Sequence, residues 1–461
     1  MPPTTWEAYQ LLHDGALALQ RAEEQGMRID VEYCKRKMNV LDRKIERITT
    51  KIEPDKLIKL WRKIYGSKFN VNSNAQLANI LYSKMHIEPL KRTETGQGST
   101  DDETLTALNI PTLNNILQIR KLRKVRDTYL GAFIREQVDG ILHPFFNLNT
   151  VVTFRSSSSN INFQNVPKRD EEAMQLVRSA ILPRPGHQLV ELDYGTLEVL
   201  ISATYHHDKN LIYDATQGDM HSDMAVEIFL LDAMDKRVPE LKHLRDATKN
   251  GFVFPQFYGD YYKNNAIYLA KKWGNLPIGR WKPEMGVPMP KGSTLGRHLI
   301  ERGITSYEKF ETHLQKIEKY FWKVRYKKYG KWREDWVDEY REKGYFDMHT
   351  GFRCKGVMSR NDVINYPVQG AAFHCLLWSF IQLDKRMREE SWDTRLIGQI
   401  HDAIVMDVPP KELEYVIKTA QQVMCQEIRD YWEWITVPLT IEADVCDIDA
   451  PWSEKHGYEI A

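Results

Sequence analysis

Hydrophobic positions in residues 7–65 recur at helical spacing, and Gly26 interrupts the pattern. After the break, a long amphipathic run passes through Met38, Leu41, Ile45 and Ile48. The opposite side of this run is rich in basic residues, which suit either a solvated helix face or a stripe that contacts phosphates. These basic residues are Lys35, Arg36, Lys37, Arg43, Lys44, Arg47 and Lys51.

A polar loop at residues 92–104 leads into further helical segments, and Ser99 or Thr100 is the expected cap of the first one. The helix that follows has apolar residues at positions 116, 119, 122 and 125. Its other side is densely basic, so both a surface face and a phosphate-binding face remain open. The cations are Arg120, Lys121, Arg123, Lys124 and Arg126.

Two segments have the pattern of strands. Residues 188–193 alternate apolar and polar side chains, end at Asp193, and precede a helical pattern that begins at Thr196. Residues 396–408 contain two apolar runs on either side of His401 and Asp402, which predicts a hairpin with an acid at its turn. Because residues 220–340 are mostly helical in pattern, the sequence indicates an α+β fold.

Length and composition set limits on this fold. The chain has 461 residues, enough for two to four substructures, and 42% of them are hydrophobic. The formal net charge is only +1, so any nucleic-acid surface must be balanced by acidic surface elsewhere. The five cysteines have no Cys-x-x-Cys spacing, and no signal-like or membrane-length apolar run is present. We expect a soluble, cytoplasmic protein without a disulfide framework or zinc site.

Asp193 and Asp402 are the candidate metal ligands. Each carboxylate is expected at the rim of a sheet, where the two could bracket a pair of divalent ions about 4 Å apart. Mg²⁺ suits carboxylate oxygens and substrate phosphates. The alternative is that each acid is an ordinary cap or turn residue at the end of a strand.

Further along the chain, cations and aromatic residues occur together twice. Arg245 and Lys249 lie one helical turn apart, ahead of Phe254 and Tyr258, which suits a triphosphate beside a stacked base. The alternative is a surface cation pair above a core stripe. Residues 318–333 also mix basic and aromatic side chains, and they suit either a single-stranded template or an amphipathic helix with buried aromatics.

Five segments, in order, resemble family A DNA polymerases, the DNA polymerase I group. They are residues 155–167, 192–198, 245–259, 365–372 and 399–402. The stretches at residues 26–30, 72–77 and 99–101 are similar to the family's thumb region, and residues 449–452 to its closing segment. The resemblance implies a right-hand architecture with an antiparallel-sheet palm, helical fingers and a helical thumb.

The resemblance also implies a division of the chain. The expected parts are a helical lead-in at residues 1–30, a thumb at 31–150, a palm at 151–205 and 351–461, and fingers at 206–350. About thirty residues precede the thumb-like part, so we expect no proofreading or 5′-nuclease domain in this chain. Several residue choices look phage-like, which would place the protein in a bacterial or phage-infected cell.

The family's chemistry implies a role for each matching residue. Asp193, Asp402 and the backbone carbonyl of Tyr194 would hold two Mg²⁺ ions, with Mn²⁺ as an alternative. Lys249 would protonate the leaving pyrophosphate. The remaining nucleotide-binding residues would be Arg245 and His221 on the outer phosphates, Phe254 on the sugar and base, and Glu198, held by Tyr258, as a gate against ribose. At the primer terminus we expect Arg155, Arg178, Asn365, Gln369 and His401.

Three features depart from the family pattern. Ala403 replaces the usual acid after the His-Asp pair, which leaves fewer carboxylates at the metals. The spacing from Lys249 to Phe254 is one residue longer than usual, and Pro255 follows, so a bulged or bent fingers helix is expected. Gly195 and Thr196 also replace the commoner Ser-Gln before the gate.

The sequence thus predicts a monomeric, template-directed DNA polymerase in DNA replication, acting on primer-template DNA and dNTPs. Phage helicase, single-strand binding protein and a separate exonuclease are candidate partners. Two alternatives stay open. A single-subunit RNA polymerase shares the palm, although Glu198 argues against it. A non-catalytic DNA-binding replication factor is suggested by Ala403 and the irregular fingers segment.

Overall fold

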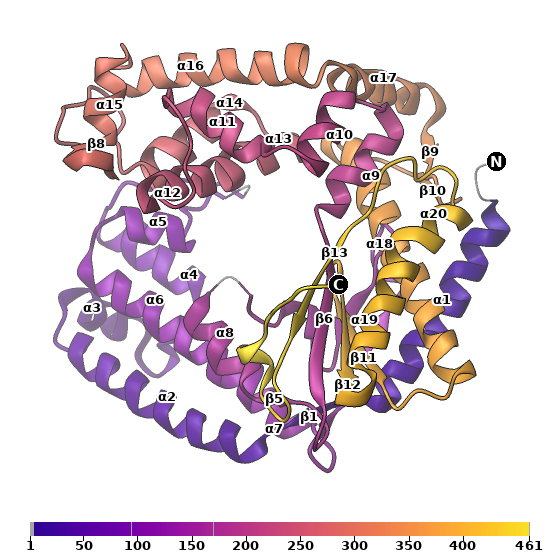
Figure 1. Cartoon of the computed structure of the whole chain (residues 1–461). Helices are drawn as coiled ribbons and strands as arrows, with labels where there is room; N and C mark the ends of the chain where they lie inside the picture. Colours follow the sequence, from indigo (N-terminus) through magenta and orange to yellow (C-terminus); the bar gives the residue numbers. More distant parts are fainter. Residues whose placement is uncertain (1–3, 94, 169, 461) are drawn as a thin grey trace.

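A computed structural model describes residues 4–93, 95–168 and 170–460 of the chain. Figure 1 shows an antiparallel sheet at the right, a group of helices at the lower left and a second helical group across the top. The sheet and its covering helices come from both ends of the sequence, whereas each helical group is one continuous stretch. The predicted α+β class is confirmed.

The central sheet has five strands in the order β11-β12-β6-β13-β14, and every neighbouring pair is antiparallel. The predicted strand at residues 188–193 is its middle strand, and the predicted hairpin at 396–408 forms two neighbouring strands. These positions confirm the sequence-based strand predictions. The strands are β6 (Gln188–Tyr194), β11 (Arg395–Ile400), β12 (Ala403–Val408), β13 (Ile441–Val445) and β14 (His456–Tyr458).

Helices from the two ends of the chain pack against this sheet. The N-terminal helix α1 (Thr5–Gln25) contacts β11 and the long helix α18 (Arg360–Glu389), so it packs against the layer of the central sheet. A Cβ atom at Gly15 would lie 2.8 Å from the Leu377 side chain, which shows how closely these helices approach. Arg21 donates from Nε and Nη2 to the Asp384 carboxylate on α18. Helices α19 (Leu413–Gln422) and α20 (Ile428–Tyr431) complete this side.

Residues 31–136 form the lower helical group. Gly26 ends α1 and begins the next segment, as the break in the pattern predicts. The cap of the loop helix differs from the expectation, because Asp101 rather than Ser99 or Thr100 accepts the backbone N–H of Thr104. The helices are α2 (Val31–Ile52), α3 (Lys56–Tyr65), α4 (Asn74–Ala78), α5 (Asp102–Ala107), α6 (Pro111–Arg123) and α7 (Gly131–Glu136).

Part of the basic stripe on residues 120–126 is used inside the protein. Arg120 donates from Nε to the Val71 carbonyl at 2.8 Å, and Lys121 lies 2.8 Å from Asp170. Arg126 pairs with Asp42 on α2. These contacts join helices to one another, so the structure favours a packing role over phosphate contact for these three cations.

Short strands and one helix connect this group to the sheet. Strand β1 lies between β2 and β5, and β3 pairs with β4. Trp452 near the C-terminus packs on Phe163 in this region, with ring centroids 5.5 Å apart. The elements are β1 (Met27–Ile29), β2 (Ile141–Leu142), β3 (Phe145–Asn147), β4 (Ser157–Ser159), β5 (Ile181–Leu182) and α8 (Glu171–Arg178).

The upper group is mostly helical, as predicted for residues 220–340. Three of the six aromatic residues in 318–333 are buried, namely Phe321, Tyr326 and Tyr329, and Trp322 and Trp332 pack against the core. The helices are α9 (Leu197–His206), α10 (Lys209–Thr216), α11 (Met220–Phe229), α12 (Pro239–Thr248), α13 (Phe254–Phe257), α14 (Tyr262–Ile267), α15 (Leu295–Glu301), α16 (Tyr307–Tyr320) and α17 (Lys327–Lys343). The short strands are β7 (Pro288–Met289), β8 (Ser293–Thr294), β9 (Tyr345–Asp347) and β10 (Arg353–Lys355).

Among the described residues, every helix is too short or too polar to cross a lipid bilayer.

Candidate active site

The two predicted metal ligands meet at one edge of the central sheet. Asp193 lies near the end of β6, directly opposite Ala403 in the neighbouring strand, and Asp402 occupies the turn that precedes Ala403. The backbone N–H of Tyr194 donates to the Asp402 carbonyl at 3.2 Å, which holds the turn against β6. His401 has a φ of 52°, an unfavourable value for a side-chain-bearing residue, and this turns the chain sharply at the site.

The surroundings of Asp402 disfavour the ionised form of its carboxyl group. Its Oδ1 atom is buried and has no hydrogen-bond partner among the described residues. Burial, together with the nearby charges of Glu198 and Asp193, raises the pKa of Asp402 to about 6. A buried carboxylate without a donor, beside a second carboxylate, is the arrangement that a bound cation would stabilise.

Asp193 has a different environment from Asp402. Its Oδ2 atom lies 3.1 Å from the ammonium of Lys168, which is half exposed and also lies 4.0 Å from Glu191. Lys168 lies outside the predicted site residues, because a lysine after a Val-Pro pair is not a sequence pattern that indicates a site. The side chain of Tyr194 points into the core, where its hydroxyl donates to the Met424 carbonyl. A metal ligand from Tyr194 would therefore have to be its backbone carbonyl.

The donor set fits hard divalent cations. Carboxylates at a site that also admits substrate phosphates suit Mg²⁺ better than metals that prefer nitrogen or sulfur. Within the described part of the chain, no cluster of three or more His, Cys, Asp or Glu side chains could hold a metal. The protein therefore offers two carboxylates, and a metal there would depend on phosphate oxygens and backbone for its other ligands.

The predicted gate is assembled beside these acids. The hydroxyl of Tyr258 donates to Glu198 Oε2 at 2.7 Å, and Arg155 donates from Nη1 to Glu198 Oε1 at 3.3 Å. Burial and the charge of Glu198 raise the pKa of Tyr258 above its ordinary value, so the phenol stays protonated and can donate. Thr196 begins the helix that carries Glu198, with a φ of 49°.

The extra residue in the fingers segment is absorbed by a wide turn. Helix α12 ends at Thr248, a π-helical turn covers Lys249–Val253, and α13 begins at Phe254. The predicted bulge is therefore confirmed. The Lys249 ammonium lies 5.4 Å from the centre of the Phe254 ring, so the two predicted nucleotide-binding residues remain on one face.

His221 lies next to Phe254, whereas Arg245 is paired within the protein. Arg245 pairs with Asp219 at 3.0 Å, and the His221 ring lies 5.5 Å from the Phe254 ring. Burial, with the charges of Arg245 and Lys249, lowers the pKa of His221 to about 4. The imidazole is therefore neutral at physiological pH and would offer a hydrogen bond rather than a positive charge.

A cavity of about 460 Å³ joins these groups. Glu198, Lys249, Phe254, Tyr258 and Asp402 all line it, and they come from widely separated parts of the sequence. A second cavity of about 500 Å³ adjoins it. The residues lining both are Arg155, Gln369 and His401.

Four of the five predicted primer-terminus residues are therefore brought together, since Asn365 lines the first cavity and donates to the Tyr258 carbonyl at 3.1 Å. Arg178 is the exception. Its side chain is 1% exposed, lies 4.0 Å above the Trp452 ring and pairs with Glu191 at 3.3 Å. In this structure the guanidinium of Arg178 is enclosed within the protein, and its place at the primer terminus stays a prediction.

Comparison with known proteins agrees with this geometry. The model of DNA polymerase family A matches residues 34–277 and 290–451, which is most of the chain. The protein belongs to DNA polymerase family A. Residues 278–289 fall between the two matched ranges.

Individual relatives are bacterial DNA polymerases I. The chain is 30% identical to the enzyme of Lactococcus lactis subsp. cremoris over 84% of this chain and 41% of that protein. It is 27% identical to that of Geobacillus stearothermophilus over 83% and 40%, and 28% identical to that of Thermus aquaticus over 93% and 46%. The chain thus spans less than half the length of these relatives.

A solved structure shares the fold. The POL domain of Pol1 from M. smegmatis, in complex with DNA primer-template and dNTP, superimposes with a TM-score of 0.72 at 22% identity. The match covers 95% of this chain and 70% of that one. The right-hand architecture of palm, fingers and thumb predicted from the sequence is confirmed.

Proposed function

We propose that this chain is a template-directed DNA polymerase that adds deoxynucleotides to a primer 3′-hydroxyl and releases pyrophosphate during DNA replication. The observation that carries the proposal is the pairing of Asp193 with the unpartnered Asp402 at the end of the sheet. Asp402 lines the cavity that also presents Lys249 and Phe254, and Asp193 lies on the neighbouring strand, opposite Ala403. Two bound Mg²⁺ ions would lower the pKa of the primer hydroxyl and neutralise the charge of the leaving group.

The protein's own groups would act around the triphosphate. Lys249 would donate a proton to pyrophosphate, and its position beside Phe254 places that donor next to the stacked base. Arg245 would bind outer phosphate oxygens, with Asp219 holding its guanidinium in place. Neutral His221 would add a hydrogen bond to the same phosphates.

Sugar choice would depend on Glu198. Two hydrogen bonds, from Tyr258 and Arg155, fix its carboxylate at the cavity wall, so the side chain cannot readily move aside. A ribose 2′-hydroxyl would have to displace a doubly bonded carboxylate, which favours deoxynucleotides. Asn365, Gln369, His401 and Arg155 would then contact the primer terminus in the minor groove, where acceptors are similar in every correct pair.

We further propose that the chain acts as a monomer, with residues 31–150 as thumb, 206–350 as fingers, and 151–205 with 351–461 as palm. The helical groups in Figure 1 support this division, because each is continuous in sequence.

Primer extension with all four dNTPs and Mg²⁺ tests the function. The wild type should extend a primer, whereas Asp193→Ala and Asp402→Ala should abolish extension and leave binding to primer-template largely intact. Binding without any elongation by the wild type would overturn the proposal in favour of a non-catalytic DNA-binding factor. Equal incorporation of rNTPs and dNTPs would favour an RNA polymerase.

A further inference from the structure

Helix α13 contributes to the walls of two different cavities. Phe254, Phe257 and Tyr258 line the nucleotide cavity, whereas Gln256 lines a third cavity of about 610 Å³. Gln256 is only 1% exposed. A buried amide is costly unless its donors and its acceptor are paired, so the partners of Gln256 show what this side chain does for the helix.

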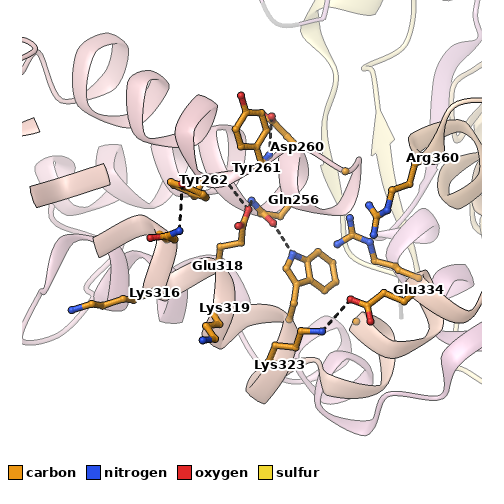
Figure 2. Close-up of a pocket in the computed structure, with 15 residues that line it drawn as sticks. Gln256, Asp260, Tyr261, Tyr262, Lys316, Glu318, Lys319, Lys323, Glu334 and Arg360 are labelled. Atoms are coloured by element: carbon orange, nitrogen blue, oxygen red, sulfur yellow. Dashed lines mark hydrogen bonds and ion pairs between the residues drawn. The ribbon is translucent and has the colours of Figure 1, made fainter. Parts of the chain in front are cut away.

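Gln256 joins α13 to two neighbouring helices. Its Nε2 atom donates to Glu318 Oε1 on α16 and to Asn265 Oδ1 on α14, both at 2.7 Å. Its Oε1 atom accepts the indole N–H of Trp322 at 2.6 Å. Figure 2 shows the Gln256 and Glu318 side chains meeting at a wall of the third cavity. Both donors of the amide and its acceptor are thus paired.

Glu318 strengthens this connection because its carboxylate accepts a second bond. The same Oε1 atom accepts the backbone N–H of Tyr262, at the start of α14, at 2.8 Å. Hydrogen bonds to a carboxylate are stronger than those between neutral groups. Asn265 is also 1% exposed, so water has little access to compete for these bonds. Helices α13, α14 and α16 are therefore held to one another at the Gln256 amide.

The backbone of α13 gives this helix little support of its own. The helix has four residues, it follows the π-helical turn, and Pro255 has no N–H to donate. A helix this short has little stability by itself. The Phe257 ring packs 5.7 Å from the Phe321 ring, but apolar contact is not directional. The hydrogen bonds of Gln256 are directional, so they fix the orientation of α13.

The orientation of α13 determines where the Tyr258 hydroxyl lies. Tyr258 directly follows α13 and is 45% exposed, so packing does little to hold its ring. Its hydroxyl nevertheless donates to Glu198 at 2.7 Å. A donor and an acceptor about 3.6 Å apart no longer form a hydrogen bond, so a displacement of about 1 Å would break this contact. A small rotation of α13 would therefore release one side of the Glu198 carboxylate.

We propose that Gln256 is a positioning residue for the sugar gate, because it ties α13 to α14 and α16 and so keeps the Tyr258 hydroxyl in contact with Glu198. The inference rests on the proposed function, in which Glu198 excludes ribonucleotides. Gln256 does not line the nucleotide cavity, and it acts through the position of the helix. Selection of deoxynucleotides therefore depends on a hydrogen-bond network behind the nucleotide cavity.

Primer extension with a dNTP and with the matching rNTP tests this role through the ratio of the two kcat/KM values. Gln256→Leu removes all three side-chain hydrogen bonds and should lower the dNTP-over-rNTP ratio by about tenfold, as expected for a lost bond to a charged group. Trp322→Phe removes only the indole donor and should lower the ratio by about threefold. An unchanged ratio in Gln256→Leu would overturn the proposal. If that variant does not fold, an unchanged ratio in Trp322→Phe would do so.

A double variant shows whether Gln256 acts through the gate. Tyr258→Phe removes the hydroxyl that holds Glu198, so adding Gln256→Leu to it should leave the ratio unchanged. A general loosening of the protein would instead lower the ratio by the same factor in both backgrounds. Equal effects in the two backgrounds would therefore refute the role of Gln256 as a positioning residue.

His313→Leu is the matched control. It removes a hydrogen bond of the same helix α16, from His313 to the Glu227 carbonyl on α11, and this bond does not involve α13. The control should keep the wild-type ratio at a temperature where denaturation curves show every variant to be folded. A loss as large as that of Gln256→Leu would mean that any weakening of α16 is enough, which contradicts the proposal.

The wild type separates this inference from the proposed function. A wild type that extends no primer would refute the proposed function itself. A wild type that uses dNTPs and rNTPs equally would refute the gate on which the inference rests. A wild type that prefers dNTPs, with the same preference in Gln256→Leu, would refute only the role of Gln256.

Discussion

Replacing Asp402 with asparagine should stabilise the metal-free protein while it abolishes extension. The Asp402 carboxylate has an Oδ1 atom that is buried without a donor, and burial raises its pKa from the ordinary value of 3.8 to about 6. An acid that ionises less readily in the folded state than in the unfolded state costs stability at every pH above its unfolded pKa. Asparagine has nearly the same shape and no charge, so it removes that cost.

The size of the effect follows from the pKa. A rise from 3.8 to about 6 corresponds to about 3 kcal/mol at pH values above 7. Asp402 is only partly buried as a residue, so water screens part of this cost and we expect a gain of about 1–3 kcal/mol. At a pH of about 4.5 the folded carboxyl is already protonated, and the gain should fall to about one third of that value.

Chemical denaturation in EDTA measures the gain, at pH values of about 4.5 and 7.5. Asp193→Asn is the control: it loses the ion pair with Lys168 at 3.1 Å, so it should not stabilise the protein. Added Mg²⁺ should stabilise the wild type and have little effect on Asp402→Asn. Two results would refute the reasoning. Asp402→Asn could be no more stable than the wild type at the higher pH, or its free energy of unfolding could rise equally at both pH values. Either result would mean that the ionised carboxylate does not destabilise the folded protein.

Three other substitutions test neighbouring parts of the site. Glu198→Ala should loosen sugar discrimination, seen as a lower ratio of kcat/KM for dNTP over rNTP; an unchanged ratio would argue against the gate. Lys168→Met should lower the Mg²⁺ concentration for half-maximal extension and tighten Mn²⁺ binding, because the Lys168 ammonium, 3.1 Å from Asp193, competes with the metal for that carboxylate. An unaltered dependence of extension on metal concentration would exclude this competition. Gln256→Leu leaves its buried partners unpaired and should destabilise the protein by about 1–3 kcal/mol in denaturant; equal stability would show that the network contributes little.

The strands were predictable because their pattern is local. Alternation at residues 188–193 and the paired apolar runs at 396–408 specify which face of each strand is buried, and the structure has both at nearly those bounds. The helix cap at Asp101 was missed by one or two residues, because several polar residues in that loop are equally able to cap. Local pattern therefore defines an element better than it defines its end.

Site residues were predictable only where short signatures cover them. Four site residues lie within such segments: Asp193, Asp402, Glu198 and Tyr258. The fold brings the last three to one cavity and places Asp193 on the neighbouring strand, opposite Ala403. Arg178 lies apart from these residues because its guanidinium packs on Trp452, which is distant in sequence and close only after folding. Lys168 was missed for the same reason, because only the tertiary fold brings its ammonium to Asp193.

The extra residue between Lys249 and Phe254 determines the type of helical turn that joins them. In a regular α-helix, residues five apart point in directions about 140° apart, which would turn Phe254 away from Lys249. A π-helical turn closes with hydrogen bonds from residue i to i+5, so positions five apart lie on one face. The wide turn at Lys249–Val253 restores that face, and the Lys249 ammonium lies 5.4 Å from the Phe254 ring. The extra residue between the two predicted nucleotide-binding residues is therefore compatible with the proposed function, because the backbone geometry changes with the spacing.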